Sequence, residues 1–379
     1  MATSRCISEV MRKVIVLLVG VVGVPLSAWA WGARGHTLVG DIATDRLKGS
    51  EAAAKVDGLL HGLDLGFAAR LPDDIKSWDP GPHAYYPESE ADLAKLDQPQ
   101  YQAIRDALRA FHRANLAYPP GGGERLHHQF HYTDVPIARV EKYRDGKVGR
   151  SPTDVVHMIT FCVKVLKGEE GEDNAFKITK PVAVILLAHF VGDIHQPLHV
   201  GAEYFTADGR KADPDLHPDA PYYGDLGGNS LRVRNIDGIV SPEGHERRLH
   251  AIWDEDLVTL MLQEVARKIG PENPSEADDV RFLIQHAPDR WQEPASLPVE
   301  HWLEAWADES QALSYEAHER LHFTQMTTRR TPYGGDEADG VVTEAVPHGY
   351  VPWACGVVQE QISRAGLRLA ALLQSCLGP

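Results

Sequence analysis

The sequence has few cysteines, no excess of basic residues and no apolar run long enough to cross a membrane. Four cysteines in 379 residues are too few for a disulfide scaffold, and no two of them form a Cys-x-x-Cys zinc motif. The formal net charge of −16 is a poor basis for holding duplex nucleic acid on a basic surface. It still allows a nucleic-acid substrate whose phosphates are bound by metal ions.

The first thirty residues have the composition of a secretory signal peptide. Three basic residues come first, the apolar run Val14–Leu26 follows, and the segment ends in Ala28-Trp29-Ala30. The run of roughly 13 residues is shorter than the ~20 that a spanning helix needs. An uncleaved anchor is the alternative. We predict a signal peptide over 1–30, a mature chain that starts at Trp31, and a secreted or periplasmic product without a stable membrane anchor.

Removal of this segment would change the cysteine count and the charge. Cys6 would be lost, and at most one disulfide could form among Cys162, Cys355 and Cys376, with the pairing left open. The charged residues of the first thirty sum to +2, so the mature chain would carry −18. Any metal would have to be bound by histidine and aspartate.

Helical periodicity dominates the rest of the chain. We expect helices over about 36–47, 51–61, 100–116, 153–167, 181–194, 250–269, 276–287, 298–319 and 355–376. We expect long polar loops over 77–99, 119–128, 202–229 and 322–350. The last helix carries Arg364 and Arg368 on its polar side. No strand pattern recurs and no repeat is present, so we predict an all-α fold with long loops, formed by one large helical domain over 31–379.

Four potential metal ligands lie within the eleven residues from His189 to His199. On a helix, His189 and Asp193 are one turn apart and project from the same side. Pro197 ends the helix, which lets His199 turn back toward that side. The same spacing recurs in His250-Ala-Ile-Trp-Asp254.

A carboxylate on an apolar helical face costs several kcal/mol unless it is paired or ligates a cation. A single His-x-x-x-Asp pair is more simply a hydrogen bond in the core. Two such pairs favour a metal, because imidazole and carboxylate are common zinc ligands.

Two further segments carry histidines of interest. His131 lies in a loop and could be a ligand or a solvated side chain. The predicted mature terminus reads Trp31-Gly-Ala-Arg-Gly-His36, and its glycines allow a sharp fold of the backbone. A free α-amine has a pKa of roughly 7.7–8.0 and can bind a metal once deprotonated. On this segment alone, a flexible terminus is the simpler interpretation.

Together these residues resemble the single-strand-specific S1/P1 nucleases, whose helical fold is shared with zinc-dependent phospholipases C. The resemblance covers nearly the whole mature chain and includes a glycine-rich loop at Asp225-Leu-Gly-Gly-Asn229 and helices containing Trp306–Ser310 and Gln361–Leu373. The matching ligand positions are Trp31, His36, Asp73, His131, His189, Asp193, His199, His250 and Asp254.

The resemblance implies three zinc ions. The first would be held by Asp73, His131, His189 and Asp193. The second would be held by the amine and carbonyl of Trp31 and by His36, with Asp193 as a bridge. The third would be held by His199, His250 and Asp254. Family members usually have tryptophan and alanine before the ligand aspartate, where this chain has Leu71-Pro72. The neighbouring Asp74 is therefore an alternative register for Asp73.

The resemblance also implies the substrate-binding residues. Asp73 and Lys76 would be catalytic, with Lys76 stabilising charge on phosphorus; Lys76 also favours the Asp73 register, because it follows by three positions. Tyr132 and Asp134 would bind a base, and Gly227 and Asn229 would complete the pocket. Stacking contributes roughly 1–3 kcal/mol per base and needs an unstacked base. The insertion over 202–224 could reshape this groove.

The predicted function is zinc-dependent hydrolysis of single-stranded DNA or RNA to products with 5′-phosphates, with 3′-nucleotidase activity, by a monomer. Its partners would be single-stranded nucleic acid and nucleotides as substrates. A phospholipase C or related phosphoesterase is the alternative enzyme, and a zinc-binding protein without catalysis is the third hypothesis. His195 is expected to be a buried neighbour of the site and not a ligand. Other histidines are expected to be solvated or to flank His131 without binding metal: His83, His127, His128, His217, His245 and His348.

Overall fold

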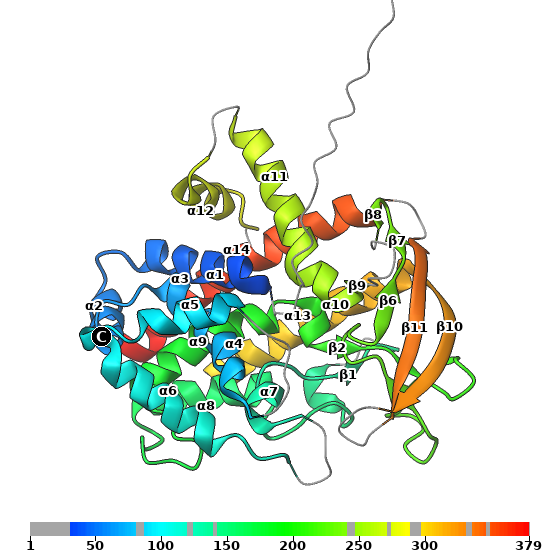
Figure 1. Cartoon of the computed structure of the whole chain (residues 1–379), viewed down its shortest axis with the longest axis horizontal. Helices are drawn as coiled ribbons and strands as arrows, with labels where there is room; N and C mark the ends of the chain where they lie inside the picture. Colours follow the sequence, from blue (N-terminus) through cyan, green and yellow to red (C-terminus); the bar gives the residue numbers. More distant parts are fainter. Residues whose placement is uncertain are drawn as a thin grey trace, which may run out of the picture.

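The computed structural model in Figure 1 describes residues 31–378 except for short gaps. The described residues are 31–80, 87–119, 124–138, 142–240, 247–270, 274–288, 297–330, 336–345 and 349–378. The predicted signal peptide over 1–30 lies outside them, as do His83, His245 and His348.

Helix α9 (Lys180–Ile194) lies at the centre of the molecule (Figure 1). Pro181 stands in its first turn, where a missing N–H leaves no hydrogen bond unmade. Its sequence is apolar on every side, and all residues from Val182 to Ile194 are buried. Helices α1 (Gly32–Leu47), α8 (Val155–Lys167) and α14 (Tyr350–Leu377) all pack against it. The polar residues of α9 are therefore inside the protein core.

The remaining helical segments cover this centre or connect its parts. They are α2 (Glu51–Leu60), α3 (Leu65–Ala68), α4 (Leu71–Asp74), η1 (Ile75–Trp78), α5 (Pro87–Lys95), η2 (Pro99–Tyr101), α6 (Gln102–Ala114), α7 (Leu126–Gln129), η3 (Tyr143–Asp145), η4 (Pro197–His199), α10 (Leu249–Ala251), η5 (Ile252–Asp256), α11 (Leu257–Ile269), α12 (Glu276–Gln285) and α13 (Val299–Glu319). The predicted mainly helical fold is confirmed, and each expected helix is present. No helix in the described part of the chain combines the length and apolar character needed to cross a bilayer.

The strands are few and short, apart from one hairpin. Strands β10 (Leu321–Arg330) and β11 (Asp336–Ala345) pair antiparallel at one edge of the molecule, in orange in Figure 1. Strand β6 (Leu231–Val233) pairs parallel to β11, and β9 (Arg247–Arg248) completes the order β10-β11-β6-β9. The expectation of a plain loop over 322–350 was therefore wrong. The pairing of β6 with β11 joins segments about a hundred residues apart, which no local pattern can reveal.

Smaller sheets stand beside the helices. Strands β1 (Val135–Pro136) and β2 (Gly201–Ala202) pair parallel. The others are β3 (Tyr204–Phe205), β4 (Lys211–Ala212) and β5 (Tyr223–Gly224), in the order β4-β3-β5, and the hairpin of β7 (Asn235–Ile236) and β8 (Ile239–Val240). The insertion over 202–224 thus contains a small sheet.

Two further expectations need correction, and the expectation of at most one disulfide is narrowed. Helix α5 interrupts the segment predicted as a loop over 77–99. Arg368 is not on a solvated face of the last helix, because it is 1% exposed and pairs with Glu309. Cys162, Cys355 and Cys376, the cysteines among the described residues, are unbridged.

Candidate metal centre

The carboxylate of Asp193 stands between two groups of potential ligands. One oxygen, Oδ2, lies 3.0 Å from Nδ1 of His131 and 3.2 Å from Nε2 of His189. The other, Oδ1, lies 3.4 Å from Nε2 of His36. The i,i+4 spacing on α9 brings His189 and Asp193 to one side of that helix. Asp193 can therefore bridge two ions.

Three groups of converging donors arise from the predicted ligands. The Asp73 group contains Asp73, His131 and His189; the His36 group contains His36, His189 and Asp193; the His199 group contains His199, His250 and Asp254. Within each group the donor atoms lie within 4.8 Å of one another, and every residue is buried. The first two groups share His189, so they form a pair of adjacent sites.

The carboxylates of Asp73 and Asp74 lie in different surroundings in the structure. Asp73 Oδ1 lies 3.7 Å from ring nitrogens of His131 and His189. The carboxyl of Asp74 is buried elsewhere, where burial and the nearby Asp92 raise its pKa well above the usual range. Of the two registers left open by the sequence, the one with Asp73 puts a carboxylate among the histidines.

Backbone carbonyls set the proton positions on three of these histidines. Nδ1 of His189 lies 2.6 Å from the carbonyl of Ala69, and Nδ1 of His199 lies 2.9 Å from that of His131. Nδ1 of His250 lies 2.7 Å from the carbonyl of Gly227. A carbonyl can only accept, so each Nδ1 carries a proton, and in a singly protonated ring Nε2 then presents a lone pair. Burial alone would lower the pKa of His189, but the carboxylates of Asp193 and Asp73 raise it.

Two of these lone pairs face each other. The Nε2 atoms of His199 and His250 are 3.0 Å apart. Burial lowers the pKa of His250 to about 3 and also lowers the pKa of His199, so neither ring carries a second proton at neutral pH. Two facing acceptors repel each other unless a cation lies between them. Asp254 Oδ2, 3.4 Å from Nε2 of His250, adds a carboxylate to the same point.

Several buried polar atoms in these groups have no hydrogen-bond partner. These atoms are the two ring nitrogens of His36 and the three oxygens Asp73 Oδ2, Asp193 Oδ1 and Asp254 Oδ2. Leaving a buried polar atom unpaired costs about 1–3 kcal/mol. Burial also lowers the pKa of His36 to about 4, which keeps its ring neutral and available to a metal. The donor set and its unpaired atoms fit divalent zinc.

Trp31 is buried beside the His36 and His199 groups. Its backbone nitrogen lies 3.1 Å from Asp254 Oδ1, and its indole N–H donates to the carbonyl of Gly192 at 2.7 Å. Gly32 has φ +49°, and a Cβ there would stand 3.0 Å from the carbonyl oxygen of Asp254. Position 32 must therefore have no bulky side chain and a left-handed backbone conformation for Trp31 to reach the site.

Lys76 supplies a positive charge at the Asp73 group. Its ammonium lies 2.6 Å from Asp73 Oδ1, and its side chain is 20% exposed. Burial alone would raise the pKa of Asp73, but Lys76 and the neighbouring histidines hold it well below its usual range. Asp73 is therefore ionised, and Lys76 stands at the solvent side of the centre.

The predicted base-binding residues flank the His199 group from two sides. Between Tyr132 and Asp134, the N–H of Thr133 donates to the carbonyl of His199 at 2.8 Å. On the other side, a Cβ on Gly227 would stand 1.9 Å from the carbonyl oxygen of Leu198, so only glycine fits there. Asn229 follows in the same turn and is half-buried. The structure thus brings both segments to one group.

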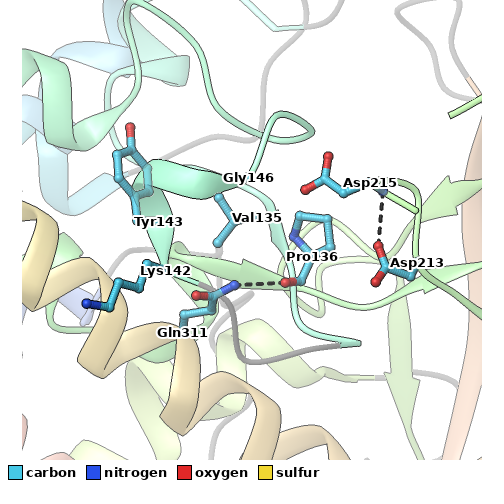
Figure 2. Close-up of a pocket in the computed structure, with 8 residues that line it drawn as sticks. All are labelled: Val135, Pro136, Lys142, Tyr143, Gly146, Asp213, Asp215 and Gln311. Atoms are coloured by element: carbon cyan, nitrogen blue, oxygen red, sulfur yellow. Dashed lines mark hydrogen bonds between the residues drawn. The ribbon is translucent and has the colours of Figure 1, made fainter. Parts of the chain in front are cut away.

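The insertion over 202–224 packs against the Asp134 side. The hydroxyl of Tyr204 donates to the carbonyl of Asp134 at 2.7 Å, and Asp215 accepts from the N–H of Val148 at 3.0 Å. Figure 2 shows a small pocket where the insertion meets β1, lined in part by Pro136 and Asp215. None of its lining residues belongs to a metal group, so this pocket is not the metal centre.

The structure also places residues that the sequence interpretation did not count among the ligands. His195 is buried and contacts Arg368, with 2.9 Å between its Nε2 and the guanidinium, so it lies outside the metal groups. His217 is exposed. Gln196, which the pattern did not single out, donates to Asp254 Oδ1 at 2.8 Å and so orients that carboxylate. Nothing in the sequence around Gln196 indicated this contact, because Gln196 belongs to no ligand motif.

One group was missed entirely. Asp79, His112 and His127 form a further set of converging, buried donors, which we call the Asp79 group. Sequence reasoning placed His127 among the histidines without a role and gave none to His112. Its members are 15 to 48 residues apart in pairs along the chain, so no short motif marks them.

We call the Asp73, His36 and His199 groups together the main centre. Comparisons with known proteins bear on its function. The S1/P1 Nuclease family model matches residues 31–378. Endonuclease 4 of Arabidopsis thaliana is 23% identical over 350 residues, covering 91% of this chain and 89% of that protein. Endonuclease 1 of the same plant is 25% identical over 260 residues, covering 67% of this chain and 62% of that protein. This second match spans less than two thirds of the relative.

Proposed function

Because the chain belongs to the S1/P1 nuclease family, we propose that it is a zinc-dependent nuclease of single-stranded DNA and RNA. Its products would carry 5′-phosphates, and it would also remove the phosphate from 3′-nucleotides. The printed names of the relatives, Endonuclease 1 and Endonuclease 4, support a cut within a nucleic-acid chain.

The observation that carries the proposal is the pair of facing lone pairs on His199 and His250, 3.0 Å apart. A core of hydrogen bonds alone would not place two unprotonated nitrogens against each other. The shared carboxylate of Asp193 supports two further ions side by side, which would give three in total. We propose Asp73, His131, His189 and Asp193 for the first ion, His36, Asp193 and the terminal Trp31 for the second, and His199, His250 and Asp254 for the third.

Zinc bound there would polarise the phosphate and lower the pKa of a water molecule. The protein's own residues would do the rest. Lys76 would stabilise negative charge that develops on the phosphate, because its ammonium stands at the Asp73 group and its side chain is partly exposed. Tyr132, Asp134, Gly227 and Asn229 would hold the base beside the His199 group. A stacked duplex base could not enter such a pocket, which gives a physical reason for single-strand preference.

We further propose that removal of residues 1–30 creates a ligand of the second zinc ion, the terminal amine of Trp31. The backbone nitrogen of Trp31 is buried 3.1 Å from Asp254 Oδ1. Cleavage before Trp31 would convert this amide into an amine with a lone pair. The family match begins at the same residue. The signal-peptide composition of the preceding segment supports secretion or periplasmic export of the mature domain over 31–379.

The decisive assay uses the protein that starts at Trp31. Single-stranded DNA, RNA, 3′-AMP and phosphatidylcholine micelles are incubated with it, each with and without a chelator, and with zinc added back. We expect chelator-sensitive cleavage of the first three and little of the lipid. Cleavage of the lipid alone would favour a phospholipase, and bound zinc without turnover would favour a binding protein.

A second assay tests the terminus. The same protein with one extra glycine before Trp31 keeps every side chain but loses the amine at the proposed ligand position. We expect it to bind one zinc fewer and to lose most of its nuclease activity. Full activity and full zinc content in the extended protein would remove Trp31 from the ligand set.

A further inference from the structure

We propose that the Asp79 group, together with His128, is a fourth metal site that binds zinc and has a structural role. It shares no residue with the three groups of the main centre. The inference therefore stands apart from the proposed nuclease function.

Three imidazoles converge on one carboxylate. Nε2 of His112 lies 2.8 Å from Asp79 Oδ1, and Nε2 of His127 lies 2.9 Å from the same oxygen. Nε2 of His128 lies 2.9 Å from Asp79 Oδ2. Three histidines and one carboxylate are a ligand set that zinc takes in tetrahedral sites.

The ring nitrogens of the Asp79 group lie at least as close to their carboxylate as those of the main centre do. In the His199 group, a ring nitrogen stands 3.4 Å from its carboxylate partner, compared with 2.8 to 2.9 Å around Asp79. The Asp79 side chain is 1% exposed and that of His127 is also 1% exposed, so both side chains are buried. The side chain of His128 is 25% exposed and gives the group an opening to solvent. An ion could enter from that side.

The charges around the group permit a cation. Burial lowers the pKa of His127 to about 4, so its ring is neutral and can donate a lone pair. Arg125 also faces the group, with its Nε 3.3 Å from Asp79 Oδ2. The same combination occurs at the main centre, where Lys76 stands beside Asp73. A basic neighbour therefore does not distinguish the Asp79 group from the proposed zinc ligands.

The place of the group in the fold indicates its role. Asp79 follows η1, six residues after Asp73, and His127 lies on α7, four residues before His131. A metal here would clamp together the two segments that deliver Asp73 and His131 to the main centre. His112, from α6, would tie both segments to a longer helix. Such an ion would stabilise the geometry of the main centre without touching substrate.

The direct test is a crystal of the wild-type protein starting at Trp31, grown with zinc chloride and measured at the zinc absorption edge. We expect an anomalous peak about 2.0–2.2 Å from an Asp79 oxygen and from the Nε2 atoms. The alternative is a hydrogen-bonded cluster, in which each imidazole donates its Nε2–H to the carboxylate. No peak, with nitrogen and oxygen in direct contact, would overturn the proposal.

Variants test the same point in solution. The double variant His112→Gln, His127→Gln should bind one zinc fewer per chain than wild type after loading and dialysis. His128→Gln, altered at a part-exposed position, should weaken binding of one zinc at least about tenfold. His157→Gln is the matched control, because His157 also pairs with a buried aspartate, Asp154, but belongs to no three-donor group.

The readout is the difference in zinc content between variant and wild type. It does not depend on nuclease activity or on how many ions the main centre holds, so the two proposals can fail separately. Equal zinc content in wild type and in a folded double variant would refute the fourth site. Loss of one zinc from the control as well would show that the difference is not specific to the Asp79 group.

Discussion

Gly192 on α9 determines how closely His36 can approach the metal centre. A Cβ added at Gly192 would stand 2.8 Å from Nδ1 of His36 and 3.0 Å from its Cε1. Contacts below 3.0 Å are essentially never made by real Cβ atoms. The imidazole cannot swing away, because its ring is stacked on His189 with 3.8 Å between the centroids. Gly192→Ala should therefore push His36 off its position by about half an ångström.

The expected change in the free energy of unfolding of Gly192→Ala follows from two opposing contributions. Alanine in a helix interior is favoured over glycine by about 1 kcal/mol. An extra methyl in a packed core costs about 1–3 kcal/mol. We expect the free energy of unfolding to fall by about 0–2 kcal/mol, a small change for a protein of this size. Misplacing a ligand has a larger effect on activity, because displacement of about 1 Å can lower rates about 10²-fold.

The assay compares kcat/KM on single-stranded DNA, zinc content and urea unfolding for Gly192→Ala and a matched control. The control is Gly58→Ala, at an exposed position of helix α2, where an added Cβ meets nothing within 4 Å. The control should gain about 0.5–1 kcal/mol and keep its activity. Gly192→Ala should lose about 10- to 100-fold in kcat/KM. Full activity and full zinc content in Gly192→Ala would refute the claim that close packing against Gly192 fixes the position of His36.

Three other predictions concern charge. Lys76→Met should lower kcat about 10²–10³-fold with zinc content unchanged; an unaltered kcat would remove Lys76 from the reaction. Burial and two nearby carboxylates raise the pKa of Asp134 to about 7, so its folded form retains a proton that the unfolded chain releases near pH 4. This contribution to stability is present below about pH 4 and is lost as the pH rises to 7. Asp134→Asn should therefore flatten the fall in unfolding free energy over that range, and an unchanged slope would contradict the shift. Arg368→Met should lower the unfolding free energy by about 1–3 kcal/mol, because His195 loses a buried contact while the part-exposed Glu309 can be resolvated; a variant as stable as wild type in urea would refute that contribution.

Local periodicity was enough to predict most of the helices. The i,i+4 spacing places His189 and Asp193 on one face of a helix whatever the rest of the chain does. The pair His250 and Asp254 has the same spacing, but a π-helical turn, η5, runs through it. Their Nε2 and Oδ2 atoms still lie 3.4 Å apart.

Charge patterning was a weaker guide. Arg368 follows Arg364 by one helical turn, and the amphipathic pattern put both on a solvated face. The structure buries Arg368 against Glu309 of α13 and against His195, the residue that follows α9. An arginine can be buried when a partner from another helix meets it, and sequence spacing along one helix cannot report such a partner.

The hairpin of β10 and β11 shows the same limit for strands. A strand is stabilised by cross-strand partners, and here β11 pairs with both β10 and the distant β6. The polar composition of 322–350 was consistent with a loop until those partners were known.

The sequence alone determined the helical class and the His-x-x-x-Asp pairs within a turn, because both follow from backbone geometry over a few residues. Tertiary structure decided which pairs meet: it placed His131 beside Asp193, chose Asp73 over Asp74 as the carboxylate among the histidines, and gathered His112 and His127 around Asp79. Those approaches depend on how whole helices pack around α9. Packing is set by the fit of many buried side chains at once, so no short stretch of sequence records it.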